Sequence, residues 1–420
     1  MSDAVRMTTL PNGFRVVTEH MPSIRSAALG VSATAGSRDE REAESGLSHM
    51  LEHMAFKGTG SLSAREIVER IEDVGGDLNA YTDYEVTAYQ ARVLGEHVPL
   101  GIELIADILR DSVFDEGEIE KERQVILQEI GEREDMPSSL AMETLQQTAF
   151  ADQALGRPII GTRETVLSFD RDAIAGYMDR HYAPDRLILS AAGMVDHDET
   201  VRAAERLFGD LETRPAPKRE PGRYAAASQR VEREVEQAHV CLGLAAPDSR
   251  DLAAQFGAQA LAAVLGGGMS SRLFQEAREE RGLCYSIFAF TEAFADAGLM
   301  TIYAATAPEQ AAELASLALR TLERVAEDVT EAEAARARAQ SKASLVMALE
   351  SPMRRAESLS RQVATRGRPL AMDEIATIVD AVDAATIRSA ARDMLDRGAP
   401  ASVYLGPARG AVPDPAARAA

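Results

Sequence analysis

Two histidines and a glutamate stand at helical spacing in the segment 46–53, Gly-Leu-Ser-His-Met-Leu-Glu-His. On a helix, His49 and His53 lie one turn apart and Glu52 lies three residues after His49, so the three side chains share a face. Two imidazoles so placed can hold one zinc ion, and the carboxylate can take a proton from a water on that ion. Helical histidines that only cap or pack are the alternative. The order H-x-x-E-H, the inverse of the commoner zinc-protease motif, favours the metal site.

A catalytic zinc ion usually has three protein ligands and a fourth position for water. Residues 115–132 predict a helix, because they combine an acidic first turn with an apolar stripe. Glu122 and Glu129 lie two turns apart on this helix and share a face. One of them could ligate zinc while the other orients a ligand, but a solvated acidic face has the same spacing. Spacing alone leaves that choice open.

Further segments match one protein family in its own order along nearly the whole chain. They are residues 46–59, 75–82, 122–130, 161–162, 181–184, 266–274 and 278–285. The chain thereby resembles the pitrilysin family of metallopeptidases, in the branch of the mitochondrial processing peptidase and its bacterial relatives. The resemblance implies that His49, His53 and Glu129 ligate one Zn²⁺ per chain. It also implies that Glu52 is the general base and Glu122 the supporting carboxylate.

The composition limits the class of protein. With 420 residues the chain is too long for one ordinary core, and 45% apolar with 27% charged residues is typical of a globular protein. A net charge of −22 argues against binding to nucleic acid or an anionic membrane and fits attraction of basic peptides. The sequence has no run of 18 apolar residues and its start has no apolar signal core, so we expect a cytoplasmic protein. Cys241 and Cys284 are expected to be buried free thiols.

The chain is also an internal repeat. Residues 28–39 resemble residues 240–251, and the two Ser-Arg-Asp triplets that end them lie 212 positions apart. An Ala-Pro pair followed by an apolar strand recurs near the end of each half. We therefore predict an α+β fold of two homologous domains, each a mainly antiparallel sheet with helices packed on one face. The expected ranges are the zinc-binding domain 1–210, a proline-containing linker 211–230, the second domain 231–408 and a disordered tail 409–420. Asn12-Gly13 predicts a hairpin turn between the first two strands.

The two halves differ where the metal ligands stand. Shifted by 212 positions, residues 49–53 fall on 261–265, Leu-Ala-Ala-Val-Leu, which cannot bind zinc. The second half carries Arg278 and Tyr285 instead, at a helix end and at a strand start. From the residues alone, a surface arginine and a half-buried strand tyrosine fit as well as a site. The family resemblance implies that the pair binds substrate and stabilises the charged tetrahedral intermediate.

Substrate binding is expected at a strand. The resemblance implies that Asn79 and Ala80 lie on a sheet edge beside the zinc, to which an extended peptide adds by main-chain hydrogen bonds. Relatives that prefer basic residues often carry acids after the third ligand. Here Ser138 and Ser139 stand where several relatives have an acid, while Glu143 remains. A preference for arginine is therefore not predicted.

The sequence thus predicts a zinc metalloendopeptidase that cleaves unfolded or extended peptides and forms a homodimer. Three alternatives keep the fold. They are a non-catalytic core subunit like those of respiratory complexes, a subunit that binds peptides without cutting them, and the catalytic half of a heterodimer with a related chain. The complete set His49, Glu52, His53, Glu129, Arg278 and Tyr285 argues against the first.

Overall fold

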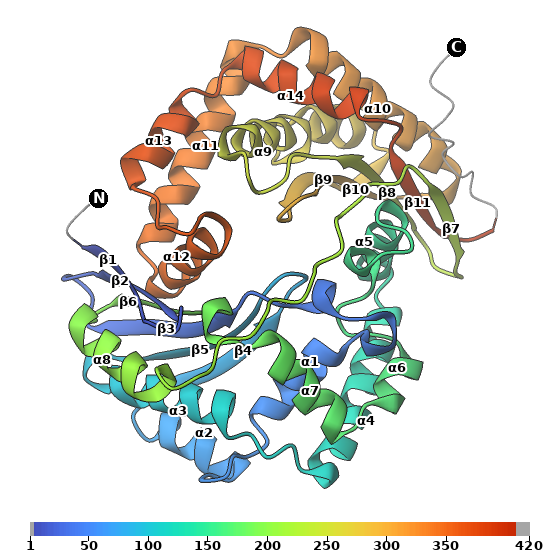
Figure 1. The fold of residues 1–420 in the computed structure, drawn as a ribbon. Coiled ribbons are helices and arrows are strands. Elements are labelled where there is room, and N and C mark those ends of the chain that lie inside the picture. Colours follow the sequence, from blue (N-terminus) through green and yellow to red (C-terminus); the bar gives the residue numbers. More distant parts are fainter. Residues whose placement is uncertain (1–3, 409–420) are drawn as a thin grey trace. The chain divides into compact units, whose positions relative to one another are not determined.

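The structure is a computed structural model that describes residues 4–408. Within it the chain forms two compact units (Figure 1). Among the described residues, unit 1 comprises 4–130, 157–220 and 346–371, and unit 2 comprises 131–156, 221–345 and 372–408. Each unit is a sheet with helices, so the predicted α+β fold of two similar halves is confirmed.

Unit 1 is built on a six-stranded sheet of order β1-β2-β6-β3-β5-β4. The strands are β1 (Val5–Thr9), β2 (Arg15–His20), β3 (Ser26–Ala33), β4 (Asp77–Thr82), β5 (Thr87–Leu94) and β6 (Leu187–Gly193). Only β2 and β6 pair in parallel; the other neighbours are antiparallel. The β1–β2 hairpin turns at the predicted Asn12-Gly13, where Gly13 has a φ of +90°. The strand β4, which contains Asn79 and Ala80, lies at the sheet edge.

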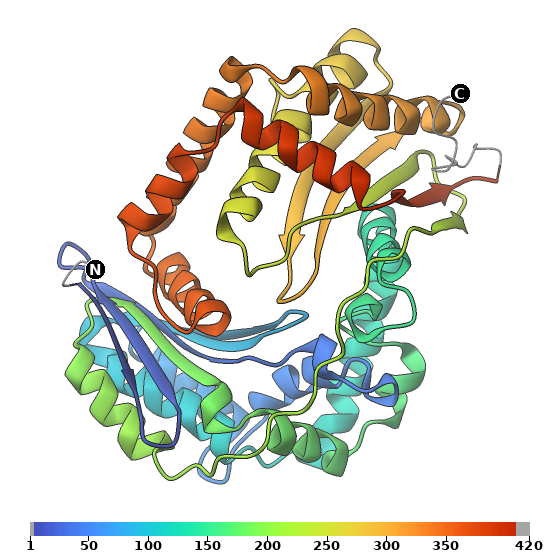
Figure 2. The same cartoon turned by 45° about the horizontal axis from the view of Figure 1, so that its top comes forward.

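The main helices of unit 1 pack on one face of the sheet, as predicted, but a late helix also covers the opposite face of the central strands. The main core holds helices that precede and follow the sheet strands in sequence: α1 (Leu47–Ala55), α2 (Ala64–Glu72), α3 (Val98–Arg110), α4 (Glu116–Glu134), α6 (Arg163–Ser168), α7 (Arg171–His181) and α8 (His197–Phe208). The late helix, α12 (Pro352–Arg366), packs against β2, β3 and β6 (Figure 2). Its Leu359 and Val363 form a small buried cluster with Val17 and Ile188. Because both faces are covered, every residue of β6 is buried, including Ser190 within its otherwise apolar sequence.

Unit 2 repeats this plan with a five-stranded sheet of order β7-β11-β8-β10-β9. The strands are β7 (Ser228–Glu232), β8 (Ala238–Ala245), β9 (Cys284–Ala293), β10 (Gly298–Thr306) and β11 (Ala401–Gly406). Its helices are α9 (Leu252–Gly266), α10 (Ala311–Asp328), α11 (Glu331–Leu349), α13 (Met372–Asp380) and α14 (Ala384–Asp396), with a π-helical stretch at Phe274–Glu280. An early helix, α5 (Pro137–Ala149), packs against β8 and β11. Cys241 and Cys284 are free and buried here, as predicted.

The helices α5 and α12 are therefore exchanged between the halves of the sequence. Pro137 begins α5 and Pro352 begins α12, 215 positions apart, so the two helices hold the same place in the repeat. Helix α5, from the first half of the sequence, covers the sheet of unit 2. Helix α12, from the second half, covers the sheet of unit 1. The compact units therefore differ from the expected ranges 1–210 and 231–408, which follow the sequence repeat. Residues 131–156 belong to unit 2 and residues 346–371 to unit 1. Residues 409–420, the expected tail, lie outside the described residues.

The expected linker 211–230 is held by side-chain contacts of Arg219 and Tyr224. Arg219 forms ion pairs with Asp39 and Glu85 in unit 1, at 2.7 and 3.2 Å. Tyr224 donates a hydrogen bond to the backbone oxygens of Gly243 or Ala399 in unit 2, at 2.8 and 3.0 Å.

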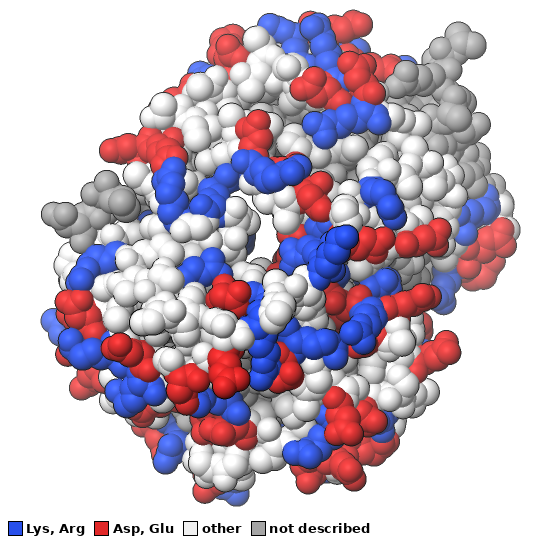
Figure 3. All heavy atoms as spheres, viewed as in Figure 1, with Lys and Arg blue, Asp and Glu red and all other residues white. Residues whose placement is uncertain are grey.

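Among residues 4–408, no helix is both long and apolar enough to span a membrane. On the side seen in Figure 3, basic and acidic side chains are interspersed without a continuous basic surface.

Candidate metal centre

The helix α1 presents its polar face because its other faces are fixed in the core. Leu47, Met50, Leu51 and Met54 are almost fully buried. At its start, the buried Glu40 carboxylate accepts hydrogen bonds from the backbone N–H groups of Gly46 and Ser48, both at 2.8 Å, and from the Ser48 hydroxyl. Gly46 has a φ of +93°, and a Cβ there would lie 2.7 Å from the backbone of Gly161. The rotation of α1 about its axis is therefore closely determined.

The three expected ligands converge. The Nε2 atoms of His49 and His53 lie 3.8 and 3.7 Å from Oε2 of Glu129 on α4. One ligand atom from each residue lies within 4.8 Å of the other two. Two imidazole nitrogens and one carboxylate oxygen form the donor set of a catalytic zinc site, so the residues present fit this ion. No second group of this kind occurs among residues 4–408.

Glu122 takes the other nitrogen of His53. Its Oε2 lies 3.0 Å from Nδ1 of His53, and its Oε1 lies 2.6 Å from the Lys57 ammonium. A proton held on Nδ1 by this carboxylate leaves the lone pair of Nε2 free for a metal. The geometry thus separates the two glutamates that spacing could not distinguish. Sequence reasoning missed Lys57, although it lies four residues after His53 within the matched segment 46–59.

The His49 imidazole is kept in its metal-binding form by burial rather than by a carboxylate partner. Its Nδ1 is buried and finds no hydrogen-bond partner in the part of the chain that the structure describes. Burial lowers the pKa of His49 to about 3, and the neighbouring His53 acts in the same direction. The ring is therefore neutral near pH 7, which is the form that binds a metal.

Glu52 lies beside the ligands and is held by β4. The Thr82 hydroxyl donates to Oε2 of Glu52 at 2.6 Å. Burial raises the pKa of Glu52 above its usual value, and the hydrogen bond from Thr82 opposes that rise. A raised carboxyl pKa suits a group that must take and return a proton near neutral pH. Sequence reasoning assigned no role to Thr82, although this residue ends the matched segment 75–82.

The edge strand β4 lies next to α1 in the same unit. Exposed and half-buried residues alternate along it, with Asn79 and Tyr81 exposed and Ala80 half-buried. The Ala80 N–H donates to the side-chain oxygen of Asn79 at 2.9 Å. The structure therefore puts Asn79 and Ala80 on a sheet edge in the unit that holds the ligands.

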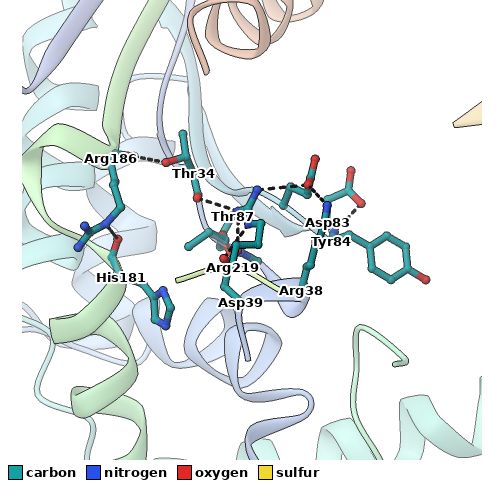
Figure 4. Close-up of polar contacts among 12 residues, drawn as sticks. Thr34, Arg38, Asp39, Asp83, Tyr84, Thr87, His181, Arg186 and Arg219 are labelled. Carbon is teal, nitrogen blue, oxygen red and sulfur yellow. Dashed lines mark hydrogen bonds and ion pairs between the residues drawn. The ribbon is translucent and has the colours of Figure 1, made fainter. Parts of the chain in front are cut away.

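The framework around α1 and β4 is a polar network (Figure 4). The backbone N–H groups of Ser37 and Arg38 donate to the carbonyls of Asp83 and Tyr84, at 3.2 and 2.8 Å. The buried Arg38 guanidinium pairs with Glu85 at 2.6 Å. The loop that precedes α1 is therefore fastened to the turn that follows β4.

Arg278 and Tyr285 come together in unit 2. The Arg278 guanidinium lies 4.5 Å from the ring centre of Tyr285 and 4.7 Å from that of Phe274. Contacts with two aromatic faces restrain the guanidinium, whose Nε also lies 3.7 Å from the Glu279 carboxylate. Tyr285 is 76% exposed, rather than half-buried as an ordinary strand tyrosine would be. Phe274 was missed as a partner, although it ends the matched segment 266–274.

The acid that follows the third ligand in sequence is already paired. The Arg133 guanidinium lies 2.7 Å from the Glu143 carboxylate in unit 2. The charge of the Glu143 carboxylate is therefore balanced by Arg133 within the same unit.

Comparisons with known proteins agree with this geometry. Residues 15–163 match the family described as insulinase (peptidase family M16), and residues 168–341 match the peptidase M16 inactive domain. A relative from Streptomyces coelicolor is 41% identical over 96% of this chain and 90% of its own length. A relative from Rickettsia bellii is 38% identical over 97% of this chain and 98% of its own. Both are described as uncharacterized zinc proteases. The fold matches a protease of *Helicobacter pylori* with a TM-score of 0.90, at 23% identity over 96% of this chain and 99% of that one. It also matches a chain of complex III from *Candida albicans*, with a TM-score of 0.85 at 21% identity over 96% of each chain. The resemblance read from the sequence is confirmed, and the chain belongs to the M16, or pitrilysin-type, family of metallopeptidases.

Proposed function

We propose that this protein is a zinc-dependent endopeptidase that cleaves unfolded or extended peptides. One observation carries the proposal: the Nε2 atoms of His49 and His53 face one carboxylate oxygen of Glu129, with Glu52 on the same helix face. Zinc in this site would supply a Lewis acid that makes a water molecule acidic at neutral pH.

The side chains of the chain then carry the proton. Glu52 accepts the proton of the attacking water and delivers it to the nitrogen of the leaving amine, so that one water and one peptide bond give an acid and an amine. Glu122 keeps the proton of His53 on Nδ1 throughout. The substrate adds to the edge of β4 at Asn79 and Ala80 by main-chain hydrogen bonds, a mode that gives weak sequence preference.

The pair Arg278 and Tyr285 completes the proposed site from another copy of the chain. Both groups can donate hydrogen bonds to a carbonyl oxygen that becomes negatively charged. We infer a homodimer in which the pair of one chain serves the zinc of its partner, and a related second chain could take the partner's place. Because Cys241 and Cys284 are free and buried, we place this dimer in the cytoplasm.

Glu52→Gln tests the catalytic role. The substitution removes the base but keeps its size and all three ligands, so hydrolysis should fall about 10²–10⁴-fold or more while zinc is retained. Mass-spectrometric mapping of products from a peptide library, with zinc and with chelator, measures the loss. A Glu52→Gln chain with near wild-type kcat would refute the role. Zinc content without turnover of any library peptide would identify a peptide-binding subunit.

Mixing inactive chains tests the dimer. Glu52→Gln chains combined with Tyr285→Phe chains should regain roughly a quarter of wild-type activity, because about half of the re-paired dimers are mixed and each has one complete site of two. Subunit exchange is checked independently by tagging one of the chains. No recovery despite exchange would show that Tyr285 does not act across the interface.

A further inference from the structure

Thr82 forms a hydrogen bond with Glu52, although Thr82 is neither a proposed metal ligand nor the proposed base. Its Oγ1 lies 2.6 Å from Oε2 of Glu52 and 3.5 Å from the backbone oxygen of Ser48. A hydroxyl has one proton to donate, and the shorter contact has the length of a strong bond to a carboxylate. The hydroxyl proton is therefore directed at Glu52.

The position of this hydroxyl is set by the end of the edge strand. Thr82 is the last residue of β4, where it is paired with Thr87 of β5. In the turn that follows, Asp83 donates its N–H to Val86 at 2.8 Å and accepts from Ser37 at 3.2 Å. Figure 4 shows Asp83, Tyr84 and Thr87 within the network that also holds Arg38 and Asp39. A backbone fixed on both sides gives Thr82 little freedom to follow a moving carboxylate.

Glu52 needs such a partner. Its side chain has three rotatable bonds, and burial without a hydrogen bond would leave the carboxylate poorly solvated. The base must hold one orientation toward the water and then toward the leaving nitrogen, within about half an ångström. The residue that fixes it also ends the strand on which the substrate is proposed to add.

We propose that Thr82 is a positioning residue that orients the Glu52 carboxylate and links it to the substrate-binding edge of β4. This inference rests on the proposed endopeptidase function. Thr82 both ends β4 and bonds to Glu52. It therefore holds the Glu52 carboxylate at a constant position relative to a peptide bound along β4. Loss of the hydroxyl should therefore lower the rate of the chemical step and leave peptide binding and zinc retention in place.

Three variants test the assignment. Thr82→Val removes the hydroxyl at nearly constant shape, and kcat should fall about 10–100-fold with KM and zinc content unchanged. Thr82→Ser keeps the hydroxyl and should restore kcat close to wild type. Thr200→Val on α8 is the control, because it removes a buried hydroxyl that donates to the Asp196 carbonyl at 2.7 Å at the start of that helix. It should leave kcat unchanged even where it lowers Tm.

A second readout does not depend on turnover. In the metal-free chain, the Tm shifts of Thr82→Val and Glu52→Ala should be non-additive, because both remove the same bond. Additive shifts, unchanged kcat in Thr82→Val, or an equal fall of kcat in Thr200→Val would each overturn the assignment. Glu52→Gln is assayed alongside: an inactive Glu52→Gln chain beside a fully active Thr82→Val chain refutes only this inference. A fully active Glu52→Gln chain refutes the proposed function itself.

Discussion

The helices α1 and α9 occupy the same place in the two halves of the repeat, and they use it in opposite ways. In α1 the positions 49, 52 and 53 carry two imidazoles and a carboxylate. The corresponding positions of α9 carry Leu261, Val264 and Leu265, which are 0, 6 and 0% exposed. One helix face is a site and the other is core. The fold therefore requires a helix beside the sheet, while two imidazoles decide whether that helix can contribute to a metal site.

The second ligand helix shows the same contrast. Glu116 begins α4 and Glu331 begins α11, 215 positions apart, and both helices have 19 residues. At this offset Glu122 and Glu129 correspond to Ala337 and Ser344. The supporting carboxylate and the third ligand are thus missing from the second half together with the imidazoles. Ala337 is buried, so its position has become part of the core of unit 2. The loss concerns the whole constellation.

The largest expected effect comes from substituting His53 and its repeat counterpart Leu265. The first side chain is expected to bind metal, and the second packs in the core. His53→Ala should remove retained zinc and activity while keeping the fold, because its side chain faces the site. Leu265→Ala, its counterpart in α9, should keep one zinc per chain and lower the free energy of unfolding by about 2–5 kcal/mol. Metal analysis after desalting and urea unfolding of the metal-free chains measure both. Two zinc ions in the wild-type chain, or zinc retained by His53→Ala, would break the comparison.

A smaller fragment tests the exchange of α5 and α12. Residues 1–210 lack α12, so the apolar sheet face around Val17 and Ile188 would lose its cover. The same fragment keeps α5, whose packing partners β8 and β11 are missing. We expect a fragment that aggregates or binds hydrophobic dyes, because an uncovered apolar face of this kind drives association. Sedimentation and dye binding give the measurement, with the full chain as control. A monodisperse fragment with a sharp unfolding transition would show that the expected range 1–210 folds alone.

The sequence was informative where local spacing decides the structure. The ligand helix, the acidic helix 115–132, the Asn12-Gly13 hairpin and the apolar counterpart of α1 all follow from patterns of a few residues. The exchange of α5 and α12 could not be predicted, since it depends on which sheet each helix covers across long stretches of sequence. Spacing alone also left open the choice between Glu122 and Glu129; the family resemblance implied the assignment, and the contacts of His53 agree with it. Lys57 and Thr82 were missed because a lone lysine or threonine has no pattern; only their contacts reveal them.

The smallest expected effect concerns acid. His181 on α7 is 4% exposed and packs against the ring of Tyr177 at 4.4 Å. Burial lowers the pKa of His181 to about 4. An unfolded histidine takes up a proton below about pH 6.5, so between about pH 6.5 and 4 the unfolded chain binds more protons than the folded chain. The free energy of unfolding therefore decreases as the pH is lowered through this range. Above pH 6.5 His181 contributes no such dependence.

His181→Gln should therefore lose less stability than wild type when the metal-free chain is taken from pH 7 to pH 5. The difference should be about 1 kcal/mol, after discounting for residual solvent screening. Urea unfolding at the two pH values measures it. Arg397, which corresponds to His181 at an offset of 216, supplies the control in unit 2, because its guanidinium stays charged over this range. Arg397→Gln should keep the wild-type acid dependence. If His181→Gln keeps it too, the acid sensitivity of unit 1 must come from its other buried groups, and the contrast at this repeat position would disappear.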